Sequence, residues 1–297
     1  MDIAHRNDAP LPASTVDDLA AMYEFRDLSH FVKIWLLTTS CLRTGADFRQ
    51  VVVDYAAEAA RHGAVYIEGI FSPGERVIRG VGWDELFTGY ADGAVEALER
   101  HHVTVRFTPD VHRELDPAVA EECARVAVRY RDRGVVGFGL GGRERGHPAE
   151  PYRRAFDIAR DGGLGIVPHA GEAAGPESVR EVLSMNPSRI RHGIRAVEDA
   201  DLVAELVERR IVLDVCPTSN LRLGGVPSLA AHPLGALHAA GVLCSIGTDD
   251  PAMFGTDLSR EYGIAAELGV TGEDAYRAGV AGALCDDQTR SNLMDIR

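Results

Sequence analysis

Hydrophobic and polar positions along the chain alternate between two kinds of segment. Seven short runs rich in β-branched residues are each entered through a glycine or a turn and left through polar residues. These runs cover residues 64–73, 103–110, 135–142, 164–172, 189–196, 211–220 and 242–251. Between them lie amphipathic segments typical of helices, such as 117–134, 151–163 and 199–210. This order predicts an α/β fold with a largely parallel sheet.

The positions of the polar residues favour a closed barrel over an open sheet. Candidate chemical groups stand at the carboxyl ends of most runs, namely Glu68, Gly142, His169, Glu172, His192, Asn220, Asp249 and Asp250. In a (β/α)8 barrel these ends converge on one mouth, where the active site lies. A doubly wound sheet is the alternative, but it would gather its functional loops at a single switch point. We therefore expect a TIM-type (β/α)8 barrel.

The number of runs leaves one barrel strand unaccounted for. Eight strands close such a barrel, and only seven runs are present. Residues 1–62 have a helical and loop-like pattern, so the first strand of the barrel is predicted to be missing. The strands on either side of that position would carry unpaired edges, which favour association into a homo-oligomer or lower the stability of the fold.

Composition narrows the class of protein and of partner. The 297 residues are 45% hydrophobic and show no composition break, which predicts one domain over 1–297. A formal charge of −14 argues against nucleic acid and anionic membranes as partners and favours a small molecule or another chain. No apolar run is long enough to cross a bilayer and no signal peptide is evident, so we expect a cytoplasmic protein. Its five cysteines are widely spaced and form no C-x-x-C pair, which indicates reduced thiols and no thiolate metal site.

Three groups of residues could carry chemistry, and each also has a structural interpretation. His169 and Glu172 end a buried run in "GIVPHAGEAAG", where they could be a core histidine and a solvated glutamate. Adjacent carboxylates Asp249 and Asp250 at the end of an apolar strand favour a metal or a basic group of a substrate, although before Pro251 they could cap a helix. His192 could accept a hydrogen bond from a metal-bound water or be a hydrogen-bonded core histidine.

Four segments, in this order and at these separations, resemble the adenosine deaminase family of metal-dependent aminohydrolases. They are "PHAGE", "RHGIRA", "LDVCPTSNL" and "SIGTDDPAMFGTDL", and the resemblance extends over nearly the whole chain from about Phe25. Together with "FTPDVHR" and "GWDELFTGY", they are most similar to a bacterial branch that acts on aminodeoxyfutalosine as well as on adenosine. The resemblance implies a (β/α)8 barrel, one zinc ion and hydrolytic removal of the 6-amino group from an aminopurine nucleoside.

The resemblance also implies roles for the metal-binding and catalytic residues. His169 matches the metal-binding histidine after the fifth strand, and Asp249 matches the aspartate near the metal. Glu172 matches the glutamate that shuttles a proton, and His192 the histidine that orients the attacking hydroxide. These residue types suit the reaction, because zinc takes imidazole and carboxylate ligands and generates a nucleophile at neutral pH. A glutamate can then protonate a ring nitrogen and the leaving amine.

For substrate binding, the resemblance implies two further residues. Gly142, in "GLGGRE", matches a glycine whose backbone lies against the purine, and Asp250 matches a carboxyl that contacts the purine ring. The group carried by the sugar is not specified by any of these segments. Adenosine, deoxyadenosine and aminodeoxyfutalosine share the reacting ring.

The chain departs from the family at its start. The family's first strand ends in a His-x-His pair that supplies two metal ligands, and this sequence contains no such pair. Three explanations compete: a start codon assigned too far downstream, a truncation, or a homologue that has lost its metal. With only His169 and Asp249 as ligands, we expect poor zinc affinity. Two functions follow as hypotheses: a zinc aminohydrolase, or a catalytically silent barrel that binds a purine nucleoside or a partner protein.

Overall fold

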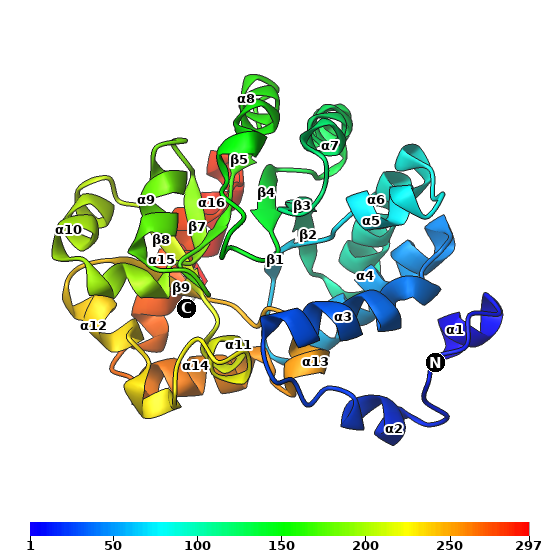
Figure 1. Ribbon diagram of the computed structural model, residues 1–297, viewed down its shortest axis with the longest axis horizontal. Coiled ribbons are helices and arrows are strands. Elements are labelled where there is room, and N and C mark those ends of the chain that lie inside the picture. The colour runs from blue at the N-terminus through cyan, green and yellow to red at the C-terminus, as the bar shows by residue number, and fades with distance from the viewer. Residues whose placement is uncertain (297) are drawn as a thin grey trace.

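Helices surround a central set of strands in the computed structural model of the chain, which describes residues 1–296 (Figure 1). The strands are β1 (Tyr66–Gly69), β2 (Thr104–Phe107), β3 (Asp110–His112), β4 (Gly137–Gly141), β5 (Gly165–Ile166), β6 (His169–Ala170), β7 (Arg189–His192), β8 (Val212–Val215) and β9 (Leu243–Ile246). The helices are α1 (Asp2–Arg6), α2 (Val16–Ala21), α3 (Leu28–Thr38), α4 (Gly45–Arg61), α5 (Gly74–Ile78), α6 (Trp83–His101), α7 (Pro117–Arg129), α8 (Arg153–Asp161), α9 (Pro176–Leu183), α10 (Ala200–Glu208), α11 (Pro217–Arg222), α12 (Leu234–Ala239), α13 (Pro251–Phe254), α14 (Leu258–Glu267), α15 (Gly272–Gly282) and α16 (Asp287–Met294). None of these helices is both long and apolar enough to span a membrane.

The strands are parallel and follow one another in sequence order. β1 pairs with β2, β4 lies between β3 and β5, and β6 to β9 form a continuous series. Backbone hydrogen bonds connect these groups, such as those from Thr108 N to Gly69 O at 3.0 Å and from Val167 N to Phe138 O at 2.9 Å. The strand order runs in one direction throughout, whereas the order in a doubly wound sheet reverses at its switch point. The predicted α/β barrel of the TIM type is confirmed, and the doubly wound alternative is wrong.

Two of the seven predicted runs each contain two short strands. β2 is separated from β3 at Pro109, and β5 from β6 at Pro168. Proline has no N–H to donate, so the ladder of hydrogen bonds is interrupted at both positions. The sequence pattern therefore located these strands but not their interruptions.

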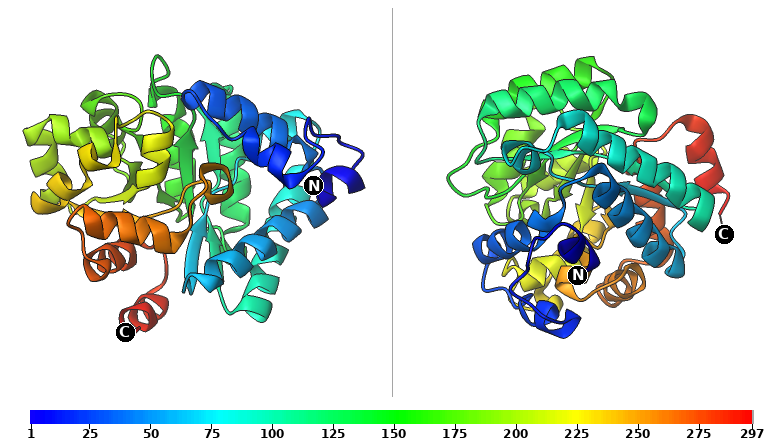
Figure 2. Two further views of the ribbon diagram at one scale, coloured as in Figure 1. Left: turned by 90° about the horizontal axis from the view of Figure 1, so that it is seen from below. Right: turned by 90° about the vertical axis from the view of Figure 1, so that its right-hand side faces the viewer.

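Among residues 1–296, no strand precedes β1, as predicted. The first 62 residues form α1 to α4, and β9 and β1 are not paired in this part of the chain. Side chains of α4 instead reach the segments after β9. Tyr55 Oη lies 3.2 Å from Thr248 Oγ1, and His62 Nδ1 lies 2.9 Å from Ser259 Oγ. Figure 2 shows α1 and α2 at the periphery of the barrel.

Local sequence signals fix the ends of the outer helices. Thr44 and Asp47 form a capping box at the start of α4. Asp116 caps α7 by accepting a hydrogen bond from Ala118 N, and Pro117 occupies its first turn. At the other end of α6, His102 adopts a left-handed conformation with φ of 57°. These signals position the helices that cover the strands.

A buried ion cluster around Arg189 connects β7 to distant parts of the barrel interior. Arg189 Nη1 lies 2.6 Å from Glu68 Oε2 on β1, and Nε lies 2.7 Å from Asp214 Oδ2 on β8. Nη1 also donates to Gly282 O at 2.8 Å. Glu68 in turn accepts a hydrogen bond from Leu284 N at 2.5 Å. One guanidinium thus holds together strands from both sides of the unfilled first-strand position.

We expect Arg189→Leu to lower the free energy of unfolding by about 3–5 kcal/mol, because it leaves two buried carboxylates without a cation. Urea unfolding followed by circular dichroism measures the change. The matched control is Arg277→Leu, which removes an exposed pair with Glu273 on α15 and should change stability by less than about 1 kcal/mol. Equal effects of the two substitutions would contradict the role assigned to the buried cluster.

Candidate active site

Three of the predicted site residues form one cluster at the carboxyl ends of the strands. Glu172, His192 and Asp249 each offer one ligand atom, and these atoms lie within 4.8 Å of one another. His192 Nε2 is 3.7 Å from Glu172 Oε2. Glu172 follows β6, His192 ends β7 and Asp249 follows β9, so the barrel brings together groups that are far apart in sequence.

His169 lies beside this cluster, with its ring centroid 5.2 Å from that of His192. Its Nδ1 is 3.0 Å from Leu140 O and 3.1 Å from Asp110 Oδ2, both of which are acceptors. Nδ1 must therefore carry the proton, and Nε2 keeps a free lone pair. This is the tautomer that a metal ligand needs.

Asp110 is held ionised behind His169. Burial alone would raise the pKa of this carboxyl, but the pKa is lowered because Arg191 and His169 favour the charged form. Arg191 pairs with Asp110 Oδ1 and donates to Thr108 Oγ1 at 2.5 Å. The ionised carboxylate keeps the acceptor that fixes the ring of His169.

Glu172 stands on a loop fixed by a second buried glutamate. The carboxylate of Glu144 accepts hydrogen bonds from the backbone N–H groups of Gly171, Glu172 and Ala174, each at 3.0 Å. Gly171 has φ of 64°, and a Cβ there would lie 2.5 Å from Val179 Cγ2, so only glycine fits. Burial raises the pKa of Glu172 to about 8, with further contributions from Asp249 and Glu144. At neutral pH this carboxyl group is therefore largely protonated.

His192 is turned toward the cluster by its backbone. Strand alternation places Arg189 and Arg191 on one face of β7 and Ile190 on the other, and His192 has a left-handed φ of 60°. A bulky residue with this φ is strained. The strained backbone lies where the side chain of His192 departs from the alternation of side chains along β7 and faces Glu172.

A chain of hydrogen bonds fixes the proton on His192. The backbone N–H of Leu234 donates to His232 Nδ1 at 3.1 Å, and burial lowers the pKa of His232 to about 4, so this ring is neutral. His232 Nε2 must then donate to Asn220 Oδ1 at 3.1 Å. The amide of Asn220 is thereby oriented to donate from Nδ2 to His192 Nδ1 at 3.2 Å.

His192 therefore carries its proton on Nε2, the nitrogen that faces Glu172. Burial lowers the pKa of His192, which keeps the ring neutral. The expected role of His192 as an acceptor for a metal-bound water stays a prediction, and in this tautomer its Nε2–H is a donor. The sequence alone does not show which ring nitrogen of His192 carries the proton, because the direction of this hydrogen-bond chain is set by the backbone amide of Leu234, 42 positions away.

Asp249 and Asp250 follow β9, and their geometry argues against a simple helix cap. Asp250 occupies the N-cap position of α13, but its side chain makes no capping hydrogen bond. Asp249 has φ of 56° and its Oδ2 accepts a hydrogen bond from Ser219 Oγ at 2.6 Å. Burial and the Asp249 carboxyl raise the pKa of Asp250 well above its usual range. Asp250 therefore favours its neutral form.

Gly142 lies outside the three-residue cluster, directly after β4. Its φ of 86° requires glycine, and a Cβ there would lie 3.3 Å from Arg113 N. The structure does not test whether its backbone contacts a purine. Asp110, Glu144 and His232 are supporting residues that the sequence analysis did not single out.

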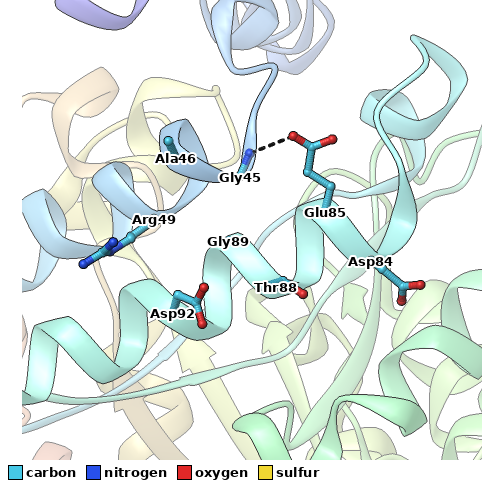
Figure 3. Close-up of a pocket in the computed structure, with 8 residues that line it drawn as sticks. All are labelled: Gly45, Ala46, Arg49, Asp84, Glu85, Thr88, Gly89 and Asp92. Carbon is cyan, nitrogen blue, oxygen red and sulfur yellow. Dashed lines mark hydrogen bonds between the residues drawn. The ribbon is translucent and has the colours of Figure 1, made fainter.

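The two cavities described for residues 1–296 are separate from this cluster. The first, of about 480 Å³, lies between α4 and α6, where Gly45 N donates to Glu85 Oε1 at 3.1 Å (Figure 3). A Cβ on Gly89 would lie 2.5 Å from Gly45 O, so the two helices approach closely there. Close helix packing explains this groove without any chemical role.

We expect imidazole ¹⁵N NMR of the metal-free protein to show His192 protonated on Nε2. Asn220→Ala should give a mixture of the two tautomers, because Nδ1 loses its donor. Asn292→Ala, which changes an asparagine on the exposed face of α16, is the control and should leave the His192 signals unchanged. A proton on Nδ1 of His192 in the wild-type protein would contradict the direction assigned to this hydrogen-bond chain.

The raised pKa of Glu172 also predicts a pH-dependent stability for the metal-free protein. Because the folded-state pKa is about 8 and the usual value is 4.5, the contribution of this group is fully present below pH 4.5 and is lost as pH rises through 8. Glu172→Gln removes the dependence. We expect the free energy of unfolding of the variant to exceed that of wild type increasingly between pH 5 and 9, by up to about 4 kcal/mol. A difference that stays constant with pH, as expected for the exposed Glu208→Gln, would refute the assignment.

Comparison with known proteins agrees with this geometry. Residues 1–296 match the adenosine deaminase family profile. The chain is 57% identical to the aminodeoxyfutalosine deaminase of Acidothermus cellulolyticus over 304 residues, which cover 100% of this chain and 85% of that protein. It superposes on the crystal structure of an adenine deaminase from Arthrobacter aurescens with a TM-score of 0.92 at 29% identity, covering 99% of this chain and 91% of the other. A Burkholderia ambifaria amidohydrolase with bound Zn gives a TM-score of 0.88 at 24% identity, with 99% and 83% coverage. The chain therefore belongs to the adenosine deaminase family and is an aminohydrolase that deaminates an aminopurine-type substrate.

Proposed function

We propose that the protein is a zinc-dependent deaminase that replaces the 6-amino group of an aminopurine nucleoside with oxygen and releases ammonia. The observation that carries this proposal is the cluster of Glu172, His192 and Asp249. It places a protonated carboxyl, an imidazole N–H and an ionisable carboxylate within reach of one small ligand. Hydrolytic deamination needs these three kinds of group.

His169 and Asp249 would hold the zinc ion. The donor set fits zinc, because His169 has a free Nε2 lone pair and Asp249 supplies a carboxylate oxygen in the cluster with His192, whose ring centroid is 5.2 Å from that of His169. The zinc-bound amidohydrolase neighbour supports the same metal. When bound, zinc lowers the pKa of water and so provides a nucleophile at neutral pH. Two ligands are half of a four-coordinate site, so we expect zinc to bind weakly unless other groups complete it.

Glu172 would move the proton that the reaction requires. Its carboxyl is protonated at neutral pH, so it can donate to a ring nitrogen of the purine and make C6 more electrophilic. The same carboxylate then takes a proton from the attacking water and delivers it to the leaving amine. Water adds its oxygen to C6, the C6–N bond breaks, ammonia leaves, and the remaining proton of the added oxygen returns to Glu172.

His192, Asp250 and Gly142 would orient the reactants. The Nε2–H of His192 can donate to the oxygen that becomes bonded to C6, and the Asn220 chain keeps that donor in place. The raised pKa of Asp250 favours its protonated form, which can donate to a purine nitrogen. The backbone at Gly142 would lie against the ring, since no side chain shields it there. The nucleoside form is supported by the 57% identical aminodeoxyfutalosine deaminase.

The test is the change in absorbance as aminodeoxyfutalosine, adenosine or adenine is converted to its 6-oxo product, together with zinc analysis of the purified protein. We expect a nucleoside to be the best substrate and Glu172→Gln to lower kcat by about 10²- to 10⁴-fold while retaining metal. Asp249→Ala should lose both metal and activity.

Glu208→Gln, an exposed change on α10, is the control and should keep full activity. Full activity in a metal-free preparation would overturn the zinc mechanism. A zinc-loaded protein that turns over none of the three substrates would favour a binding role instead.

A further inference from the structure

Arg113 is a buried cation beside the candidate active site that has no part in the proposed chemistry. It directly follows β3 and is only 4% exposed. Its backbone is fixed on both sides, because its N–H donates to Gly141 O at 3.0 Å and its carbonyl accepts a hydrogen bond from the hydroxyl of Tyr152. The guanidinium therefore extends from a rigid point at the end of the strand.

This guanidinium joins two loops at the carboxyl ends of the strands. Its Nη2 donates to the backbone carbonyl of His169 at 2.7 Å, and its Nη1 donates to that of His147 at 3.0 Å. His169 begins β6 and is the histidine that we propose to bind zinc, whereas His147 lies between β4 and α8. The planar fork of donors in arginine can bind two acceptors at once. One side chain thus sets the distance between these loops.

The charge of Arg113 also acts on the loop that carries Glu172. Burial lowers the pKa of Arg113, and the carboxyl of Glu144 is the group that most opposes this shift. The same carboxylate accepts hydrogen bonds from the N–H groups of Gly171, Glu172 and Ala174. An ionised carboxylate accepts stronger hydrogen bonds than a neutral one, and a nearby cation favours the ionised form. Arg113 therefore supports the carboxylate that holds this loop.

The short turn from His169 to Glu172 is held at both of its ends. At its start, a carbonyl accepts a hydrogen bond from the guanidinium, and at its end, an N–H donates to the carboxylate that the guanidinium supports. The side chains of these two residues are the proposed zinc ligand and the proposed proton carrier. Because the reaction needs both groups in a fixed geometry, a displacement of about 1 Å can lower the rate by about 100-fold.

We propose that Arg113 is a positioning residue for the deamination, which sets the geometry of His169 relative to Glu172. The inference rests on the proposed function, because these two residues carry the chemistry there. Arg113 acts through the backbone of His169 and the carboxylate of Glu144, without contact to the substrate. Loss of the guanidinium therefore slows the chemical step and leaves substrate affinity unchanged.

The first test measures kcat and KM for the best nucleoside substrate with zinc-supplemented protein. We expect Arg113→Met to lower kcat by about 100-fold and to change KM by less than about threefold. Arg113→Lys keeps the charge but loses the fork of donors, so it should lower kcat by about 10-fold. Arg154→Met, which removes an exposed guanidinium that pairs with Glu121, is the matched control and should keep full activity.

The second test separates positioning from a general stabilisation of the fold. Amide hydrogen exchange of the metal-free protein reports local opening at Gly171, Glu172 and Ala174. In Arg113→Met, we expect the acceleration at these amides to exceed that at Leu213, on β8, by about 10-fold. Equal acceleration at both places would assign Arg113 to overall stability and overturn the proposal. If thermal unfolding shows that Arg113→Met does not fold, Arg113→Lys supplies both measurements, with smaller effects in the same direction.

The outcome is separable from that of the proposed function. In a protein that releases ammonia from no nucleoside, faster exchange confined to residues 171–174 would support the role of Arg113 in the geometry of the turn and contradict the deaminase mechanism. Deamination with an unchanged kcat in Arg113→Met would do the reverse. A raised KM with an unchanged kcat would place the guanidinium against the substrate and overturn the proposal.

Discussion

The pairing of buried carboxylates with two arginines of β7 is the constraint on which the interior depends. Arg189 neutralises Glu68 and Asp214, and Arg191 neutralises Asp110. Without these cations, the carboxylates could not stay ionised inside the barrel. The same arginines also supply order, because Asp110 can fix the tautomer of His169 only while it is charged. Stability and site geometry therefore share the same interactions.

The carboxyls at the mouth have the opposite electrostatic environment. Glu172 and Asp250 are not paired with arginine among residues 1–296, and burial raises the pKa of each. The carboxyls paired with arginine have structural roles, whereas Glu172, with a pKa of about 8, can exchange a proton near neutral pH. The positions of Arg189 and Arg191 on β7 therefore determine which carboxyls support the fold. The carboxyls without an arginine partner are those that we propose to act on the substrate.

Much of the fold was predictable from the sequence, because the runs of β-branched residues and the helix caps are local signals. All seven runs contain strands, and residues 1–62 form helices as expected. The interruptions at Pro109 and Pro168 are local signals too, because proline cannot donate to a strand ladder. The site residues could be named from motifs, and the structure brings Glu172, His192 and Asp249 together. What the motifs could not provide is the direction of hydrogen bonds, since His192 is polarised through His232 and Asn220 by a backbone N–H in another segment.

Backbone strain shows where the barrel gives up stability to form this cluster. His192 and Asp249 are both non-glycine residues with left-handed φ, of 60° and 56°; His192 ends β7, and Asp249 lies in the segment between β9 and α13. Such conformations cost of order 1–3 kcal/mol each, and they persist only when the surroundings fix them. Asn220 and Ser219, neighbours on α11, hold the two side chains in place by hydrogen bonds. One short helix after β8 therefore stabilises both strained positions, which explains how a donor from β7 and a carboxylate from β9 can face the same small volume.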